Sequence, residues 1–399
     1  MSYRIEQAIC YLQENAITGW LVRDYQYSNV VLWELFGERV ENLTRPVWLW
    51  IPASSQPKMI CHTVDVKRFR SQKQMIKPYK NREEMLAELK GLFGEFDVDR
   101  PVVAMDYSAN YNLPRVSRID AGSLELIKGF DVDVISSENV MQFSLERWTQ
   151  EQLESHRSAV SGLNRAIKDA FAFVGENIRW KLTEHDVAEF IRGRLDMFGI
   201  EYDGGPVVAF DKNTSDPHYE PRPESASIIR RDGWLLIDLW GRKKIVTGNQ
   251  NLPISGDITW VAKIGSEPTR RQKQVFEVVR SARDTAFKYL ESTVLSGRYP
   301  EGWEIDQVAR DVIIESGYGE YFIHRLGHSL GHRVHSNGVN LDNWESHDTR
   351  QVIPGIGVTI EPGIYLPDFG VRLEMDVFIN EDGPEITVEK QEEIFLIET

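Results

Sequence analysis

Short apolar runs alternate with amphipathic stretches along the first 145 residues. Residues 4–16 carry apolar side chains at helical spacing, and similar patterns recur at about 81–95 and 120–128. Strand-like apolar runs lie between them, at residues 20–22, 47–51, 102–105 and 132–135. This alternation predicts an α/β domain with a partly parallel sheet. Its loops hold neither a glycine-rich phosphate loop nor a His/Cys cluster, which favours a structural or oligomerising role over substrate shaping.

The pattern changes in segment 136–150, so we predict one domain over residues 1–145 and a second over 146–399. The second domain begins with two helical patterns, at about 149–175 and 183–198. Strand-like runs follow at 206–210, 233–239 and 257–264. Helices therefore precede strands here, which is typical of an α+β arrangement.

The second domain contains a weak internal repeat. AIKDAF at 166–171 resembles ARDTAF at 282–287, and HDVAEFI at 185–191 resembles IDQVARDVI at 305–313. Two amphipathic helix pairs could match by chance. The conserved order and near-equal offsets favour a duplicated α+β unit, with functional side chains where the halves meet.

Two aspartates lie on apolar strands. Asp238 ends the run WLLIDLW, and Asp257 opens the run DITWVAKIG. A buried carboxylate is costly unless a cation or a hydrogen-bond partner compensates it. A salt bridge would explain either residue alone, whereas two acids on neighbouring strands favour a cation site.

Histidines gather in one segment. Residues 324–336 read HRLGHSLGHRVHS and contain His324, His328, His332 and His335. Such clusters are typical of metal or proton-transfer sites. The spacing matches neither a zinc finger nor HExxH, and a polar loop that happens to be rich in histidine is the alternative.

Two glutamates complete the candidate set. Glu361 lies between an apolar run and a Pro-Gly turn in GVTIEPGIYL, and Glu374 lies inside GVRLEMDVFI. Alternation along a strand would send Arg372, Glu374 and Asp376 to one face. We interpret that face as lining the site; the alternative is an exposed polar strand face.

Two aspartates, two glutamates and an imidazole form an oxygen-rich donor set. Such a set suits Mn²⁺, Co²⁺, Fe²⁺ or Zn²⁺ better than sulfur-loving metals. Its donors exceed the needs of one ion and fit two ions bridged by carboxylates and a hydroxide. A bridging water becomes a nucleophile near neutral pH.

Composition narrows the function classes. The net charge of −15 and the pI of about 5.2 argue against nucleic-acid binding, because phosphates would be repelled. Only Cys10 and Cys61 occur, which suits a reducing compartment. The chain lacks both a signal-peptide pattern and an apolar run long enough for a membrane span. We therefore expect a cytoplasmic protein without membrane partners.

The pattern resembles the pita-bread metallopeptidases, which include aminopeptidase P, prolidase, methionine aminopeptidase and the metal-free creatinase. The matching stretches occur in the family's order and cover about residues 150–399. They are PHYEP (217–221), LIDLW (236–240), SGDIT (255–259), HRLGHSLGHRVH (324–335), TIEPGIY (359–365) and VRLEMDV (371–377). The first 140 or so residues resemble the N-terminal domain of the creatinase, aminopeptidase P and prolidase branch.

The resemblance implies a role for each matched residue. Asp238 would chelate one metal, Asp257 and Glu374 would bridge two metals, and His328 and Glu361 would complete the other shell. Glu361 would also accept the proton from the attacking water. His218 and His335 would line the pocket and stabilise the tetrahedral intermediate. His324 would be a further pocket histidine, and Arg372 would order the site or the far end of the substrate. His332 matches no such role, and we interpret it as structural.

Two departures concern the strand that carries Asp257. Nineteen positions separate it from Asp238 (257 − 238), more than is usual in the family, and Asn249 stands at the usual second position. We interpret residues 241–256 as a hairpin loop with an insertion, because added loop length costs little. Trp260 stands where relatives often carry arginine.

These observations predict a two-metal peptidase, most plausibly with Mn²⁺, that hydrolyses Xaa-Pro bonds in small proline-containing peptides as a dipeptidase or an aminopeptidase. The predicted fold is α+β: an N-terminal creatinase-like α/β domain and a C-terminal pita-bread domain. The resemblance also implies a homodimer. A different hydrolase or lyase on the same site, or an inactive interaction module, remains the alternative. Creatinase-like chemistry is disfavoured because all five ligands are present.

Overall fold

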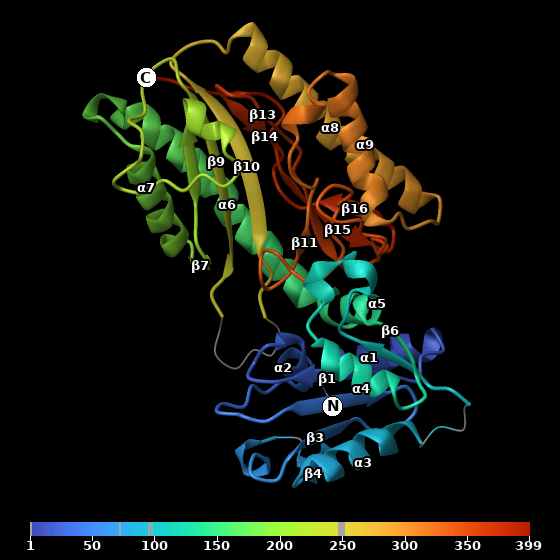
Figure 1. The fold of residues 1–399 in the computed structure, drawn as a ribbon. Helices are drawn as coiled ribbons and strands as arrows, with labels where there is room; N and C mark the ends of the chain where they lie inside the picture. Colours follow the sequence, from blue (N-terminus) through green and yellow to red (C-terminus); the bar gives the residue numbers. More distant parts are fainter. Residues whose placement is uncertain (1, 72, 95, 97–98, 246–251) are drawn as a thin grey trace. The chain divides into compact units, whose positions relative to one another are not determined.

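The computed structural model describes residues 2–71, 73–94, 96, 99–245 and 252–399 (Figure 1). The chain divides into two compact units, Met1–Glu146 and Arg147–Thr399. None of the helices in these ranges combines the length and the apolar character that crossing a membrane requires.

The first unit is built on a six-stranded mixed sheet in the order β4-β3-β2-β1-β5-β6. β1 pairs with β5, β5 with β6, and β3 with β4 in parallel, whereas β2 runs antiparallel to both of its neighbours. The partly parallel α/β sheet is therefore confirmed. The strands are β1 (Gly19–Asp24), β2 (Val47–Pro52), β3 (Lys58–His62), β4 (Ile76–Tyr79), β5 (Val102–Met105) and β6 (Asp133–Ser136).

Helices cover both faces of this sheet, which is why its strands are apolar on both sides. Along β2, Leu49 and Ile51 belong to one core, whereas Trp48 and Trp50 belong to the other. The first core also takes side chains from α1 and α2, and the second from α3 and α4. The helices are α1 (Tyr3–Glu14), α2 (Val30–Phe36), α3 (Arg82–Phe93), α4 (Ala121–Lys128) and α5 (Glu138–Met141).

The second unit places its strands between two helix pairs, α6 with α7 and α8 with α9 (Figure 1). The long helices α6 and α8 begin with the same device: Thr149 with Gln152, and Thr269 with Gln272, form reciprocal capping boxes. This shared start supports the duplicated α+β unit. The helices are α6 (Gln150–Asn177), α7 (Glu184–Met197), α8 (Arg270–Leu295) and α9 (Gly302–Glu315).

Mostly antiparallel sheets form the centre of this unit, with β17 parallel to β10. One has the order β17-β10-β9-β7 with β8 also on β9, a second has the order β11-β12-β15-β16, and β13 pairs with β14. The strands of the first sheet are β7 (Ile200–Glu201), β8 (Val207–Phe210), β9 (Trp234–Lys243), β10 (Gly256–Ile264) and β17 (Phe395–Ile397). The others are β11 (Ser329–Leu330), β12 (Gly357–Ile360), β13 (Gly363–Tyr365), β14 (Gly370–Arg372), β15 (Met375–Asn380) and β16 (Gly383–Ile386).

The two halves of the unit are hydrogen-bonded across β10. The amide of Asp257 donates to the Asp376 Oδ2 atom at 2.9 Å, and the amide of Glu374 donates to the Thr259 carbonyl at 3.3 Å. The seam between the halves therefore runs through residues that the sequence marks as candidate ligands.

The prediction that Asp238 ends its strand is wrong. β9 continues to Lys243, because Gly241 pairs with Gly256 and the polar residues after it pair with β7. Arg242 adds a 2.8 Å ion pair to Glu201 of β7. A polar continuation can thus remain a strand when a second strand supports it. The predicted hairpin is present, and Asn249 lies outside the described residues.

The prediction that Glu374 lies inside a strand is also wrong. β14 ends at Arg372 and β15 begins at Met375, so Glu374 lies in the break. Its amide bonds to Thr259 and that of Leu373 bonds to the Pro362 carbonyl, which takes both residues out of the ladder. An apolar alternation cannot reveal such a switch of partners.

Candidate metal centre

All five predicted ligands line one cavity of about 400 Å³ in the second unit. Asp238 comes from β9 and Asp257 from β10, whereas His328 lies just before β11. Glu361 follows β12, and Glu374 lies between β14 and β15. The cavity thus gathers side chains from both halves of the unit.

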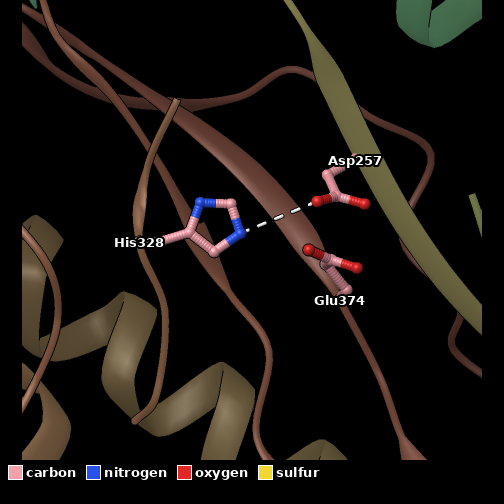
Figure 2. A group of neighbouring side chains, drawn as sticks. All are labelled: Asp257, His328 and Glu374. Atoms are coloured by element: carbon pink, nitrogen blue, oxygen red, sulfur yellow. Dashed lines mark ion pairs between the residues drawn. The ribbon is translucent and has the colours of Figure 1, made fainter. Parts of the chain in front are cut away.

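Three of the five form a tight group. Asp257, His328 and Glu374 each offer one atom within 4.8 Å of the others, and Figure 2 shows the three side chains turned toward one another. The His328 Nε2 atom lies 3.6 Å from Asp257 Oδ2 and 3.3 Å from Glu361 Oε1. Asp238 adjoins this group but binds Arg372, whose Nη2 atom is 2.5 Å from Asp238 Oδ2.

One oxygen of each of three carboxylates in the cavity lacks a protein partner. Asp238 Oδ1, Asp257 Oδ1 and Glu374 Oε1 are buried and accept no hydrogen bond from the described part of the chain. Burial, and then the neighbouring carboxylates, raise the pKa of both Asp257 and Glu374 well above the ordinary range. Burial also raises the pKa of Glu361 to about 7, against the opposing effect of Arg372. Crowded acids with free oxygens fit divalent cations.

The imidazole of His328 is oriented to bind a metal. Its Nδ1 atom is 3.2 Å from the Ser329 carbonyl, which can only accept, so Nδ1 carries the proton. The lone pair of Nε2 then faces the carboxylates. The Ser329 carbonyl therefore decides which nitrogen of His328 faces the carboxylates.

Two threonines that sequence reasoning missed fix the glutamates. Thr259 donates to Glu374 Oε2 at 2.8 Å, and Thr359 donates to Glu361 Oε1 at 3.2 Å. Each lies two positions from a predicted ligand on the same strand or its extension, Thr259 after Asp257 and Thr359 before Glu361. Strand alternation places such residues on one face, which is the signal that could have found them.

The other predicted pocket residues also line the cavity, namely His218, His324, His335 and Arg372. The rings of His335 and His328 lie 4.3 Å apart, edge to face. His332 does not line the cavity; its Nδ1 atom lies 3.0 Å from the Pro253 carbonyl, in keeping with a structural role.

A chain of hydrogen bonds joins the Arg372 guanidinium to His324. Arg372 Nη1 donates to the Tyr365 hydroxyl at 3.0 Å, and this hydroxyl lies 2.8 Å from His324 Nε2. Burial, aided by Arg372, lowers the pKa of His324 to about 3. His324 is therefore neutral at pH 7, and its Nε2 atom accepts a hydrogen bond from the Tyr365 hydroxyl.

Glu184 holds the loop that carries His218. Its buried carboxylate accepts the Tyr219 hydroxyl at 2.6 Å and the amides of Phe210 and Ser227, both at 2.6 Å. Sequence reasoning missed this residue, because a glutamate in the first turn of a helix is ordinarily a surface residue. The loop is thus fixed from beneath, whereas the His218 side chain remains exposed in the cavity.

Solved structures share this fold over nearly the whole chain. A dipeptidase PepE from Mycobacterium ulcerans matches with a TM-score of 0.73 at 19% identity, covering 99% of this chain and 97% of that one. An Xaa-Pro dipeptidase from Bacillus anthracis matches with a TM-score of 0.62 at 20% identity, covering 98% and 99%. An uncharacterized peptidase from Staphylococcus epidermidis is 24% identical over 94% of this chain and 95% of its own length.

Fold, carboxylate cluster and relatives together define the class of protein: it is a metallopeptidase. The model of metallopeptidase family M24 matches residues 154–381, more than half of the chain. The chain belongs to metallopeptidase family M24, and the resemblance read from its motifs is confirmed.

Proposed function

We propose that this metallopeptidase hydrolyses Xaa-Pro bonds in short peptides with two divalent ions. One observation carries the proposal: five metal-type side chains from separate elements line one cavity, and three of their buried oxygens lack protein partners. The printed name of the Bacillus anthracis neighbour, an Xaa-Pro dipeptidase, supports the choice of bond. The oxygen-rich donor set favours Mn²⁺, with Co²⁺, Zn²⁺ or Fe²⁺ as substitutes.

In this proposal the ligands divide between two ions. Asp238 would help to hold one ion, His328 and Glu361 would help to hold the other, and Asp257 and Glu374 would contribute to both. When bound, the ions lower the pKa of water and polarise the carbonyl under attack. The four carboxylates provide enough negative charge to balance two divalent cations.

The protein's own groups supply the remaining steps. The Glu361 carboxylate accepts the proton of the attacking water and passes it to the leaving nitrogen. His218 and His335, which both line the cavity, orient the scissile carbonyl and stabilise its developing negative charge. Arg372 keeps Asp238 in place through their ion pair and anchors Tyr365 and His324.

We also propose that residues 146–399 form the catalytic domain and residues 1–145 an accessory domain. The low cysteine content supports a cytoplasmic location, and the family resemblance supports a homodimer. A dipeptidase binds the free carboxylate beyond proline, whereas an aminopeptidase leaves that end open. Arg325, paired with Glu345 at 2.9 Å in the cavity wall, is a candidate for binding that carboxylate.

The test is hydrolysis by metal-free protein to which single divalent ions are returned. We expect Mn²⁺ to restore release of the first residue from Xaa-Pro dipeptides. Cleavage of Gly-Pro-Xaa tripeptides would identify an aminopeptidase, and its absence a dipeptidase. Lack of turnover of both peptide classes with every divalent ion would refute the proposal.

A further inference from the structure

Trp240 lies beside the metal ligands on the same sheet face. Along β9, Asp238 and Trp240 are partly exposed while Leu239 between them is buried, so the two share a face. The register pairs Trp240 directly with Asp257 of β10, and pairs Asp238 with Val207 of β8. Residues opposite each other on adjacent strands have neighbouring side chains. The indole therefore adjoins both aspartates, and it lines the same cavity.

The indole ring is held rigidly. A Cβ atom at Gly205 would lie 2.6 Å from Trp240 Cη2, so the ring packs directly on that glycine, whose φ is +62°. Trp240 Nε1 donates to the Asp203 carbonyl at 3.3 Å. Arg192 Nη2 donates to the Gly205 carbonyl at 2.8 Å and fixes the segment beneath the ring. Trp240 is thus a preformed wall.

The wall is apolar, whereas charged and histidine side chains make up most of the remaining cavity lining. Pro206, Val207 and Val334 line the cavity with Trp240. Charged and hydrogen-bonding groups suit the peptide backbone and termini, and an apolar wall suits a side chain. A flat indole offers a large contact area at little cost in conformational entropy.

The neighbouring charges indicate which peptide residue lies on this wall. The scissile carbonyl belongs to the residue before the scissile bond, and in the proposed function the divalent ions polarise that carbonyl. Asp238 and Asp257, which would hold those ions, adjoin Trp240. The first residue, and with it the side chain before the scissile bond, is therefore the one beside the indole.

We propose that Trp240 forms an apolar subsite that selects a large aliphatic or aromatic side chain at the residue before the scissile bond. This inference rests on the proposed function and names its substrate class: peptides that begin with leucine, phenylalanine or similar residues.

The experiment measures kcat/KM for Gly-Pro, Ala-Pro, Leu-Pro and Phe-Pro with Mn²⁺-loaded protein. We expect the native enzyme to prefer Leu-Pro over Gly-Pro by about ten-fold or more, the scale of small apolar differences in a pocket. Trp240→Ala should lose this preference, because kcat/KM should fall much more for Leu-Pro and Phe-Pro than for Gly-Pro. Trp240→Phe should keep most of the preference for Leu-Pro, and it provides the test if the alanine variant does not fold. Trp180→Ala, at a tryptophan that is 79% exposed, is the matched control.

An equal loss on all four substrates, or a native preference for Gly-Pro, would overturn the inference. If the native enzyme cleaves no Xaa-Pro peptide, the proposed function fails, and calorimetric binding of leucine amide and glycinamide decides the subsite. Tighter leucine amide binding that Trp240→Ala abolishes would support the subsite, whereas equal binding of both amides would refute it.

Discussion

The two histidines His328 and His335 face the cavity in different ways. His328 contacts the Ser329 carbonyl through Nδ1, and its Nε2 atom lies near two carboxylates, those of Asp257 and Glu361. His335 lies edge to face on that ring, and its own side chain is exposed in the cavity. The first histidine is therefore placed to bind metal and the second to meet substrate.

Two histidine variants should separate these roles. His328→Ala should abolish turnover and reduce bound metal, because a ligand is lost. His335→Ala should retain metal but lose about 100-fold or more in kcat, the scale of removing one stabilising donor. Measurements of metal content and kcat check both variants.

His347→Ala, at an exposed histidine outside the cavity lining, is the control and should change neither metal content nor kcat. Normal turnover in His335→Ala would contradict the role assigned to His335.

The hydroxyl of Thr259 should control metal affinity. This hydroxyl donates to Glu374 Oε2 and accepts from Arg372 Nε at 3.1 Å. It therefore orients the Glu374 carboxylate without being a metal ligand itself. Thr259→Val should weaken metal binding by about 10–100-fold, the usual effect of losing such a partner. Titration of metal-free protein with Mn²⁺ measures this. Thr259→Ser, which keeps the hydroxyl, should restore affinity; equal weakening in both variants would argue against the hydrogen bond.

At the scale of elements, buried His156 of α6 joins both halves of the second unit. Its Nδ1 atom lies 2.9 Å from the Ser255 carbonyl before Asp257, and Nε2 lies 2.7 Å from Thr387 Oγ1 after β16. Burial lowers its pKa to about 4 from an unfolded value of 6.5. The neutral ring thus stabilises the fold above pH 6.5, and this contribution is lost as the pH falls toward 4.

Acid should therefore weaken the native protein more than a variant without this imidazole. We expect the free energy of unfolding to drop by roughly 1 kcal/mol per pH unit from His156 between pH 6 and 4. His156→Gln should be less stable at pH 7 but should show a shallower drop. Urea unfolding at pH 7, 6 and 5 measures both. Parallel pH profiles would contradict the assignment of the acid sensitivity to His156.

Apolar periodicity predicted most of the elements, and its failures come from strand and hydrogen-bond partners that are distant in sequence. The runs at 102–105 and 257–264 fall within β5 and β10 because burial on both faces demands continuous apolar residues. β9 outlasts its apolar run because β7 supports a polar continuation. Glu374 falls in a strand break because its amide pairs across the seam. Partners distant in sequence decide both outcomes.

The same limit applies to the candidate site. Unusual acids on apolar strands and a histidine-rich segment mark the residues that line the cavity. Thr259 and Thr359 could have been predicted, since they share strand faces with candidate ligands. Glu184 could not, because it acts on a loop 26 or more positions away. Trp240 could not, because its place beside Asp257 depends on the cross-strand register. Burial and register are properties of the folded chain.

At the scale of the whole molecule, the candidate metal ligands lie on the seam between the duplicated halves. Buried acids of like charge repel one another and destabilise the fold unless cations neutralise them. Metal removal should therefore lower the melting temperature, and restoring Mn²⁺ should raise it with concentration, as binding to the folded state requires. Differential scanning calorimetry with and without a chelator measures this. An unchanged melting temperature would contradict the proposed coupling of metal and fold.

Five side chains are proposed to surround two cations. Anomalous scattering from crystals of Mn²⁺-loaded protein tests this arrangement most directly. We predict two manganese peaks among Asp238, Asp257, His328, Glu361 and Glu374, with Asp257 and Glu374 touching both. Peaks elsewhere, a single peak at saturating Mn²⁺, or an empty cluster in an active crystal would contradict it.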